Sequence, residues 1–173
     1  MAIFLTSDWH FNHDKDFLYL PRGFTNVEEM NETIIKNHNS MVSPEDEVYA
    51  LGDLMMHDNE LGKECISRLN GKIHVVRGNH DTDSRIEIYK NMPNIVEVCE
   101  AKFLKFKKWL FILSHYPTLV GNGDDPKPVF NCHGHTHSPE IFQFPDCYNV
   151  NPEAHNNFPI LLDDIKAQII ARR

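Results

Sequence analysis

Histidine accounts for 11 of the 173 residues, and several histidines stand in short groups with aspartate, asparagine and glycine. Histidine is the commonest metal ligand and a frequent general acid or base. In an extended segment, side chains two residues apart point the same way, so D-x-H and H-x-H pairs can reach one metal or two adjacent ones. The groups in chain order are Asp8-Trp9-His10, Gly52-Asp53, Gly78-Asn79-His80-Asp81, Ser114-His115 and Gly134-His135-Thr136-His137. Their composition favours a metal site.

The same residue types indicate which reaction such a site would perform. Two cations about 3.5–4 Å apart can hold the attacking and leaving oxygens of a phosphoryl transfer. A carboxylate such as Asp53 can bridge two cations, and the neutral amide of Asn79 would leave the site net positive toward an anionic substrate. We therefore predict a two-metal site that hydrolyses a phosphate ester.

Each of the five groups follows a predicted strand. The strands are expected at residues 3–5, 48–51, 73–76, 109–113 and 129–132. Helices are expected at 27–39, after a capping-box pattern at 25–28, and at 59–69. Strands that alternate with helices predict a largely parallel sheet, whose sites form at the carboxyl ends of its strands.

The second half of the chain has a different pattern. Residues 102–106 and 109–113 form a predicted hairpin, residues 141–144 a further strand, and residues 162–171 a terminal helix. Hydrophobic residues make up 41% and charged residues 24%, which is a globular composition. We expect a single α/β domain over residues 1–173, built as a layered β-sandwich flanked by helices.

The ordered groups resemble the pattern of the calcineurin-like metallophosphoesterase superfamily, which runs D-x-H, G-D, G-N-H-[DE], H and G-H-x-H. The resemblance extends from Asp8 to His137, most of the chain. The strings at 6–13 and 69–72 are similar to those of small single-domain members found in bacteria and phages. One local departure is Asn12, where a glycine would be expected before His13.

The resemblance implies a role for each site residue. The first metal would be held by Asp8, His10 and His137, and the second by Asn79, His115 and His135, with Asp53 bridging both. A hydroxide activated by the metals would attack phosphorus, with His80 near the leaving oxygen and Asp81 orienting His80. His13 and Arg22 are expected to contact the substrate phosphate. Manganese or iron is the expected metal, and zinc, cobalt or nickel would also suit these mixed ligands.

Simpler interpretations exist for single residues and for the whole chain. Asp53 could cap a helix, and Asn79 could occupy a left-handed turn. The alternative function is a metal-binding interaction module without catalysis. A degenerate module would be expected to have lost His80 or an imidazole of the H-x-H pair, and the sequence retains them all.

The charge of the chain bears on its partners. A net charge of -8 weighs against binding to extended nucleic acid, so we expect a small phosphate ester or nucleotide as substrate. Loops at 11–25, 57–62 and 118–128 are expected to set its specificity. The basic cluster of Lys102, Lys105, Lys107 and Lys108 is interpreted as protection of an edge strand, with Phe103, Phe106, Trp109 and Phe111 around it in the core.

The four cysteines form no C-x-x-C pair, which favours a reducing, cytoplasmic setting. The amino terminus lacks a basic region, its apolar run is too short for a signal peptide, and we expect no membrane span. The sequence does not determine the oligomeric state.

Overall fold

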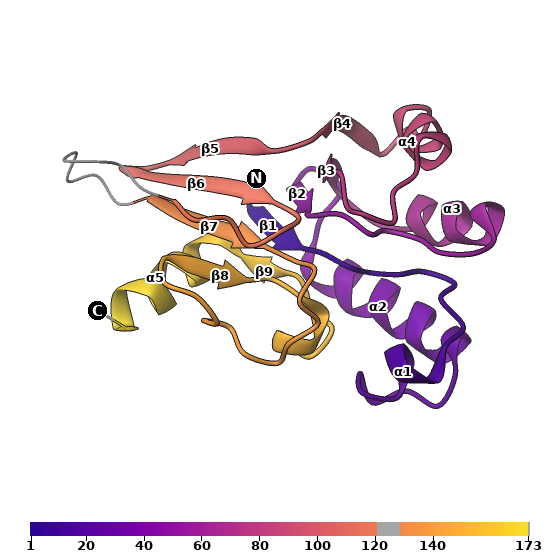
Figure 1. The fold of residues 1–173 in the computed structure, drawn as a ribbon. Coiled ribbons are helices and arrows are strands. Elements are labelled where there is room, and N and C mark those ends of the chain that lie inside the picture. Colours follow the sequence, from indigo (N-terminus) through magenta and orange to yellow (C-terminus); the bar gives the residue numbers. More distant parts are fainter. Residues whose placement is uncertain (121–128, 173) are drawn as a thin grey trace.

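The fold contains two β-sheets with helices packed around them. A computed structural model of the chain describes residues 1–120 and 129–172. Figure 1 shows α2 (Val27–Met41), α3 (Asn59–Ser67) and α4 (Asp83–Lys90) on the right, with the second sheet and α5 (Leu162–Arg172) on the left. This mixed α/β arrangement confirms the predicted layered sandwich with flanking helices.

The first sheet is parallel except at one edge. Its strand order is β4-β3-β2-β1-β9. The strands are β1 (Ile3–Thr6), β2 (Glu47–Ala50), β3 (Lys72–Val76), β4 (Ile95–Cys99) and β9 (Ile160–Leu161). Only β9 runs antiparallel to its neighbour, β1. Because β1 to β4 are parallel, their carboxyl ends lie at the same edge.

The second sheet has the order β5-β6-β7-β8. Its strands are β5 (Lys102–Phe106), β6 (Trp109–Ser114), β7 (Val129–His133) and β8 (Cys147–Asn149). The hairpin of β5 and β6 is antiparallel, as predicted, whereas β6, β7 and β8 are parallel. The carboxyl ends of β6 and β7 therefore also lie together.

Two separate cores lie on opposite faces of the first sheet. Phe4 and Val48 pack with the apolar residues of α2, α3 and α4. Their neighbours Leu5 and Tyr49 point the other way and pack with Phe111 and other residues of the second sheet. Successive side chains of a strand face opposite sides, so burial of both faces explains the continuous apolar runs of β1 and β2.

The longest helix begins at Val27, as predicted, but its cap differs from the box expected at residues 25–28. Asn26 is the N-cap of α2, and its side chain accepts a hydrogen bond from the backbone N–H of Glu29 at 2.8 Å. The Glu29 carboxylate in turn accepts from the backbone N–H and the hydroxyl of Thr25. The box therefore uses Glu29 rather than Glu28, which lies in the exposed first turn.

Several predicted elements of the second half need correction. Residues 141–144 form no strand, and Ile141 and Phe142 instead pack on the second core from an irregular segment. The Phe142 ring meets the Tyr148 ring of β8 edge-on at 5.3 Å. Apolar packing without ladder hydrogen bonds thus produced a strand-like sequence pattern. The sequence interpretation also missed α1 (Asp16–Tyr19), α4, β4, β8 and β9.

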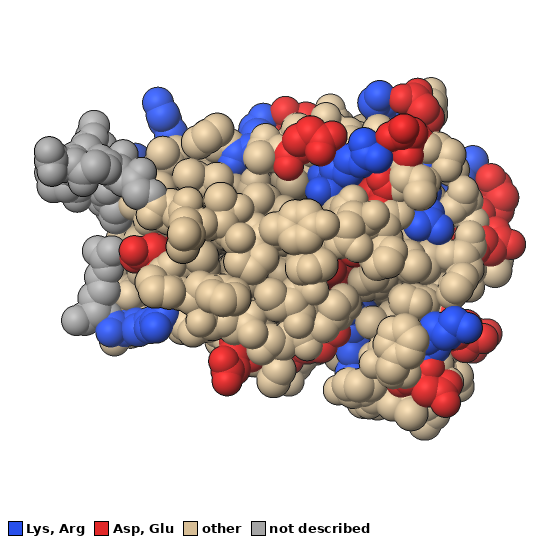
Figure 2. Space-filling model, viewed as in Figure 1, with Lys and Arg blue, Asp and Glu red and all other residues tan. Residues whose placement is uncertain are grey.

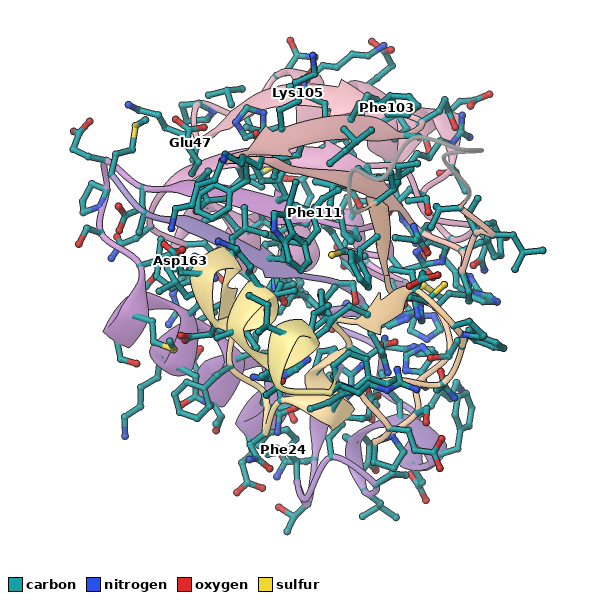
Figure 3. All side chains as sticks on the ribbon, turned by 90° about the vertical axis from the view of Figure 1, so that its left-hand side faces the viewer. Phe24, Glu47, Phe103, Lys105, Phe111 and Asp163 are labelled. Atoms are coloured by element: carbon teal, nitrogen blue, oxygen red, sulfur yellow. The ribbon has the colours of Figure 1, made fainter. Side chains whose placement is uncertain are left out.

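The hairpin of β5 and β6 carries the basic cluster, and two of its lysines are paired with carboxylates. Lys102 lies 2.7 Å from Glu97, and Lys107 lies 2.5 Å from Asp163. Figure 2 shows blue and red atoms side by side around the edge of one face, whose centre is mainly uncharged. In Figure 3, Lys105 lies on the outer side of β5 and Phe111 lies between the layers. Phe103 is 67% exposed, so its predicted place in the core is wrong.

All four cysteines are free thiols. Within residues 1–120 and 129–172, no helix combines the length and the apolar character that crossing a lipid bilayer requires.

Burial of His38 makes the free energy of unfolding depend on pH. Burial lowers the pKa of His38 from 6.5 to about 4, although the ring donates a hydrogen bond from Nε2 to the Asn70 carbonyl at 2.9 Å, which opposes this shift. Between these values the unfolded chain binds a proton at this ring and the folded chain does not. Stability therefore falls as pH falls from 6.5 to 4, by about 3 kcal/mol from this residue.

We expect His38→Gln to lose less stability over this interval than the parent protein. Urea unfolding of the two metal-free proteins at pH 7 and pH 4.5 measures the difference. If both proteins lost the same free energy of unfolding between pH 7 and pH 4.5, His38 would not be the origin of the pH dependence.

Candidate metal centre

Each predicted group lies just beyond the carboxyl end of a strand, as expected. Asp8 follows β1, Asp53 follows β2, Asn79 follows β3, His115 follows β6 and His135 follows β7. The loops from both sheets therefore converge at one edge of the sandwich. The site is assembled from segments far apart in the chain, since the backbone N–H of His135 donates to Asp8 Oδ2 at 2.9 Å across 127 residues.

Asp8 is the centre of the first ligand cluster. Its Oδ1 atom lies 3.7 Å from Nε2 of His10 and 3.6 Å from Nε2 of His137. Asp8, His10 and His137 form a group able to hold one metal ion, the set that the sequence predicted. Because ligand bonds of about 2.0–2.2 Å would separate ligand atoms by at most about 4.4 Å, these distances fit a common cation.

The second cluster centres on Asp53. Its Oδ2 atom lies 3.5 Å from Nε2 of His115 and 3.8 Å from Nε2 of His10, so it faces both clusters. Asn79 Oδ1 lies 2.8 Å from the same His115 nitrogen. Asp8 joins Asp53 and His115 in a second group able to hold a metal, a participation that the sequence did not predict.

His135 lies on the outer side of this second cluster. Its ring centre is 5.0 Å from that of His115 and 4.5 Å from that of Tyr116. Burial lowers the pKa of His135, and the charge of His115 lowers it further. A neutral imidazole is the form that binds a metal.

The electrostatics of the two buried aspartates favour a cation between them. Burial opposes ionisation of Asp8, but the imidazole of His10 and the charges of His115 and His137 hold its pKa well below the usual range. Burial and the charge of Asp8 together raise the pKa of Asp53. The two carboxylates therefore resist simultaneous ionisation, and a bound cation would relieve that repulsion.

Unpaired atoms support the same conclusion. Among the residues that the structure describes, Asp8 Oδ1 and both ring nitrogens of His10 are buried without a hydrogen-bond partner. Buried polar atoms are normally paired, because an unsatisfied one costs about 1–3 kcal/mol. The residues present therefore fit a metal ion as the missing partner.

The backbone explains how the paired side chains converge. Asp8, His10, Asp53, His135 and His137 all have positive φ, between 47° and 69°. The predicted reason for convergence, an extended segment, is therefore wrong for both the D-x-H and the H-x-H pair. Left-handed conformations of residues other than glycine cost about 1–3 kcal/mol each and concentrate at functional sites.

Gly78 is required by the close approach of two loops. A Cβ atom at this position would collide with Oδ1 of Asp53 and would lie 2.5 Å from its backbone nitrogen. The absence of a side chain thus lets the loop after β3 pack directly on the loop after β2, which brings Asn79 beside Asp53 and His115.

Asp81 holds the loops together rather than contacting the ring of His80. Its Oδ2 atom accepts backbone hydrogen bonds from Asp53 at 2.9 Å and from Gly78 at 2.8 Å, while Oδ1 accepts from the Tyr89 hydroxyl at 2.8 Å. Among the described residues, no hydrogen bond joins Asp81 to the His80 side chain, so the predicted orienting role needs correction. Asp81 is fully buried and positions the backbone that carries Asp53.

Arg22 contacts the backbone of the loop after β1. Its guanidinium is fully buried and donates to the carbonyls of Asp8 at 2.8 Å and Trp9 at 3.2 Å, and to Glu153 at 2.8 Å. These contacts direct the guanidinium to the loop backbone behind the ligands. Arg22 therefore stabilises the loop after β1, and its contact with substrate phosphate stays a prediction.

Glu153 is the site residue that the sequence interpretation missed. Its Oε1 atom lies 2.8 Å from Nδ1 of His137 as well as from Arg22. Burial opposes its ionisation, but His137 and Arg22 lower its pKa to about 2. Burial likewise opposes protonation of His137, yet Glu153 and Asp8 raise the pKa of that ring. A carboxylate behind a metal-binding histidine fixes the ring and increases its basicity.

We expect Glu153→Gln to weaken both the fold and metal binding. At pH 7 the free energy of unfolding should fall by about 3 kcal/mol, because Arg22 keeps its buried charge without its partner. This deficit should shrink as pH falls from 4.5 toward 2, since the parent then loses the same charge. Metal affinity should fall about 10- to 100-fold. Urea unfolding and metal titration measure these effects, and the exposed Glu140→Gln is the matched control.

His13 and His80 line one cavity beside the first cluster. The ring of His10 lies 5.2 Å from that of His13 and 5.7 Å from that of His80. His80 is exposed, its backbone N–H donates to Asp53 Oδ1 at 2.8 Å, and its carbonyl accepts from Arg85 at 2.6 Å. Burial lowers the pKa of His13 to about 4, with smaller effects from neighbouring imidazoles. His13 and His80 are thus within reach of a bound ligand.

Comparison with known proteins identifies the family. Residues 1–155 match the model of the calcineurin-like phosphoesterase superfamily domain. An uncharacterised protein of Methanocaldococcus jannaschii is 35% identical over 173 residues, which cover 93% of this chain and 87% of that protein.

Solved structures share the fold. A protein of unknown function from Aquifex aeolicus has a TM-score of 0.76 at 24% identity, covering 96% of this chain and 98% of its own. A novel archaeal phosphodiesterase has a TM-score of 0.51 at 18% identity, covering 88% of this chain and 83% of its own. The family match extends over most of the chain, and the chain belongs to the calcineurin-like phosphoesterase superfamily.

Proposed function

We propose that the protein is a hydrolase of phosphate esters that uses two metal ions. One observation carries the proposal: two adjacent ligand clusters share Asp8, and its Oδ1 atom lies buried beside the ring of His10 with no hydrogen-bond partner for either side chain's facing atoms among the described residues. Asp53 would bridge the two metals, because its Oδ2 atom faces a histidine of each cluster. His135 and Asn79 would complete the second site.

Two bound cations would neutralise the negative charge of a phosphate ester and activate a water for attack on phosphorus. The chain itself supplies the remaining functions. His80 lies beside the ligands with an exposed ring, and we assign it the transfer of a proton to the leaving oxygen. Asp81 keeps the loop of Asp53 in place by accepting hydrogen bonds from the backbone N–H groups of Asp53 and Leu54.

Mixed imidazole, amide and carboxylate ligands support manganese or iron as the metal, with zinc, cobalt or nickel as alternatives. Interspersed acidic and basic residues on the surface support a small substrate, a phosphate ester or a nucleotide, rather than extended nucleic acid. The archaeal phosphodiesterase with the same fold adds support for diester substrates.

The proposal is tested by assaying manganese-loaded protein on bis-p-nitrophenyl phosphate and on p-nitrophenyl phosphate, with a chelator-treated control. We expect metal-dependent release of p-nitrophenol, and the ratio of the two rates distinguishes a diesterase from a monoesterase. A protein that contains two metals per chain and hydrolyses neither ester would instead support the non-catalytic binding module.

A further inference from the structure

A cavity of about 470 Å³ opens beside the first ligand cluster, and its two walls differ in chemistry. One wall consists of the site imidazoles, including His10, His80 and His137. The remaining lining residues are His13, Glu153 and a group of apolar side chains, Phe17, Leu18, Pro21 and Met56, called here the apolar wall. Ligand sites typically combine an apolar lining with a few convergent polar groups in a volume of roughly 300–1,000 Å³.

Phe17 is the main exposed surface of the apolar wall. Its side chain is 73% exposed, while the adjacent Leu18 is only 5% exposed and anchors α1 in the first core. The Phe17 ring meets the His13 ring edge-on, with centres 5.6 Å apart and planes at 88°. A single exposed phenylalanine needs no explanation on a surface, but this one lines the same cavity as the proposed metal ligands His10 and His137.

The arrangement separates the two ends of a possible ligand. A phosphate held at the ligand clusters would direct its ester group toward Phe17, Pro21 and Met56. Among the described residues that line the cavity there is no lysine or arginine to bind a second anion, and the carboxylate of Glu153 is already paired with Arg22 and His137. An aromatic group would bury apolar area there and meet Phe17 in the edge-to-face or offset geometry that aromatic pairs prefer.

We propose that this cavity receives an aromatic group esterified to the substrate phosphate, so that Phe17 determines specificity for aryl phosphate esters over alkyl ones. The inference rests on the proposed function, since it places the phosphate at the metal centre. It identifies a substrate class from the cavity walls and assigns the segment 11–25 its part in specificity.

The affinities of two phosphonates that are not hydrolysed test this inference without a turnover assay. Phenylphosphonate and methylphosphonate carry the same metal-binding group and differ only in the substituent. We expect manganese-loaded protein, with metal content verified by elemental analysis, to bind phenylphosphonate at least about tenfold more tightly in calorimetric titrations. Phe17→Ala should reduce this preference to within about threefold and leave the Kd of methylphosphonate unchanged.

Phe103→Ala is the matched control, because Phe103 is 67% exposed on β5 and lies in the second sheet. It should retain the preference of the parent. Equal affinity of the parent for both phosphonates, or a preference that survives in Phe17→Ala, would overturn the inference and leave the proposed function standing. If metal-loaded protein bound neither phosphonate, the proposed function would fail together with the inference.

Discussion

Replacement of Asp53 by Ala is expected to remove bound metal and to lower kcat/KM by at least about 10³-fold. The Asp53 carboxylate faces His10 of one cluster and His115 of the other, so its loss opens both sites at once. Metal content per chain and hydrolysis of bis-p-nitrophenyl phosphate measure the effect. Unchanged turnover would contradict the bridging role.

The stability of the metal-free variant distinguishes loss of a ligand from loss of the fold. Burial and the charge of Asp8 raise the pKa of Asp53, so its removal relieves repulsion between two carboxylates. We therefore expect metal-free Asp53→Ala to be at least as stable to urea as the metal-free parent. Asp163→Ala, which changes an exposed aspartate of α5, should retain metal and activity.

Replacement of His80 by Gln is expected to lower kcat by about 10²- to 10⁴-fold while the protein keeps its full metal content. The backbone groups of His80, which contact Asp53 and Arg85, remain in the variant, and only the imidazole is lost. Steady-state kinetics beside metal analysis separates these two effects.

The matched control for His80 is His57→Gln. His57 is an exposed histidine whose ring centre lies 5.2 Å from that of His13, and its kcat should change by less than about threefold. Loss of metal from His80→Gln would show that His80 supports the ligands instead of transferring a proton. A kcat equal to that of the parent would exclude both roles.

The apolar runs before the ligands determined how much of the fold was predictable. Residues 3–5 and 48–51 are continuously apolar and residues 73–76 are apolar except for His74, and their largely buried side chains explain why β1, β2 and β3 were identified directly. The sequence interpretation missed β4, whose apolar run is interrupted by Glu97, and it missed β8 and β9, which have only three and two residues. Short strands depend on neighbouring strands for their hydrogen bonds, which a local pattern does not contain.

The site shows the same division between local and tertiary information. Ligand types stood beside strand ends and were readable in the sequence, and the structure brings those residues together. The partner of His137 was not readable, because Glu153 lies 16 residues further along the chain, beyond β8. Arg22 was predicted to reach the substrate pocket beside His13, whereas tertiary contacts with Glu153 and a loop carbonyl bury its guanidinium.

The placement of two cores on opposite faces of the first sheet limits how this chain can change in length. A residue inserted within β1 would exchange the faces of Phe4 and Leu5, which belong to different cores. Asp8 would shift along the strand at the same time, by about 3.3 Å. Insertions in the loop 11–25 leave that register intact and add little loop-closure entropy. In evolution, new substrates are therefore accessible through longer loops, whereas strand lengths stay fixed.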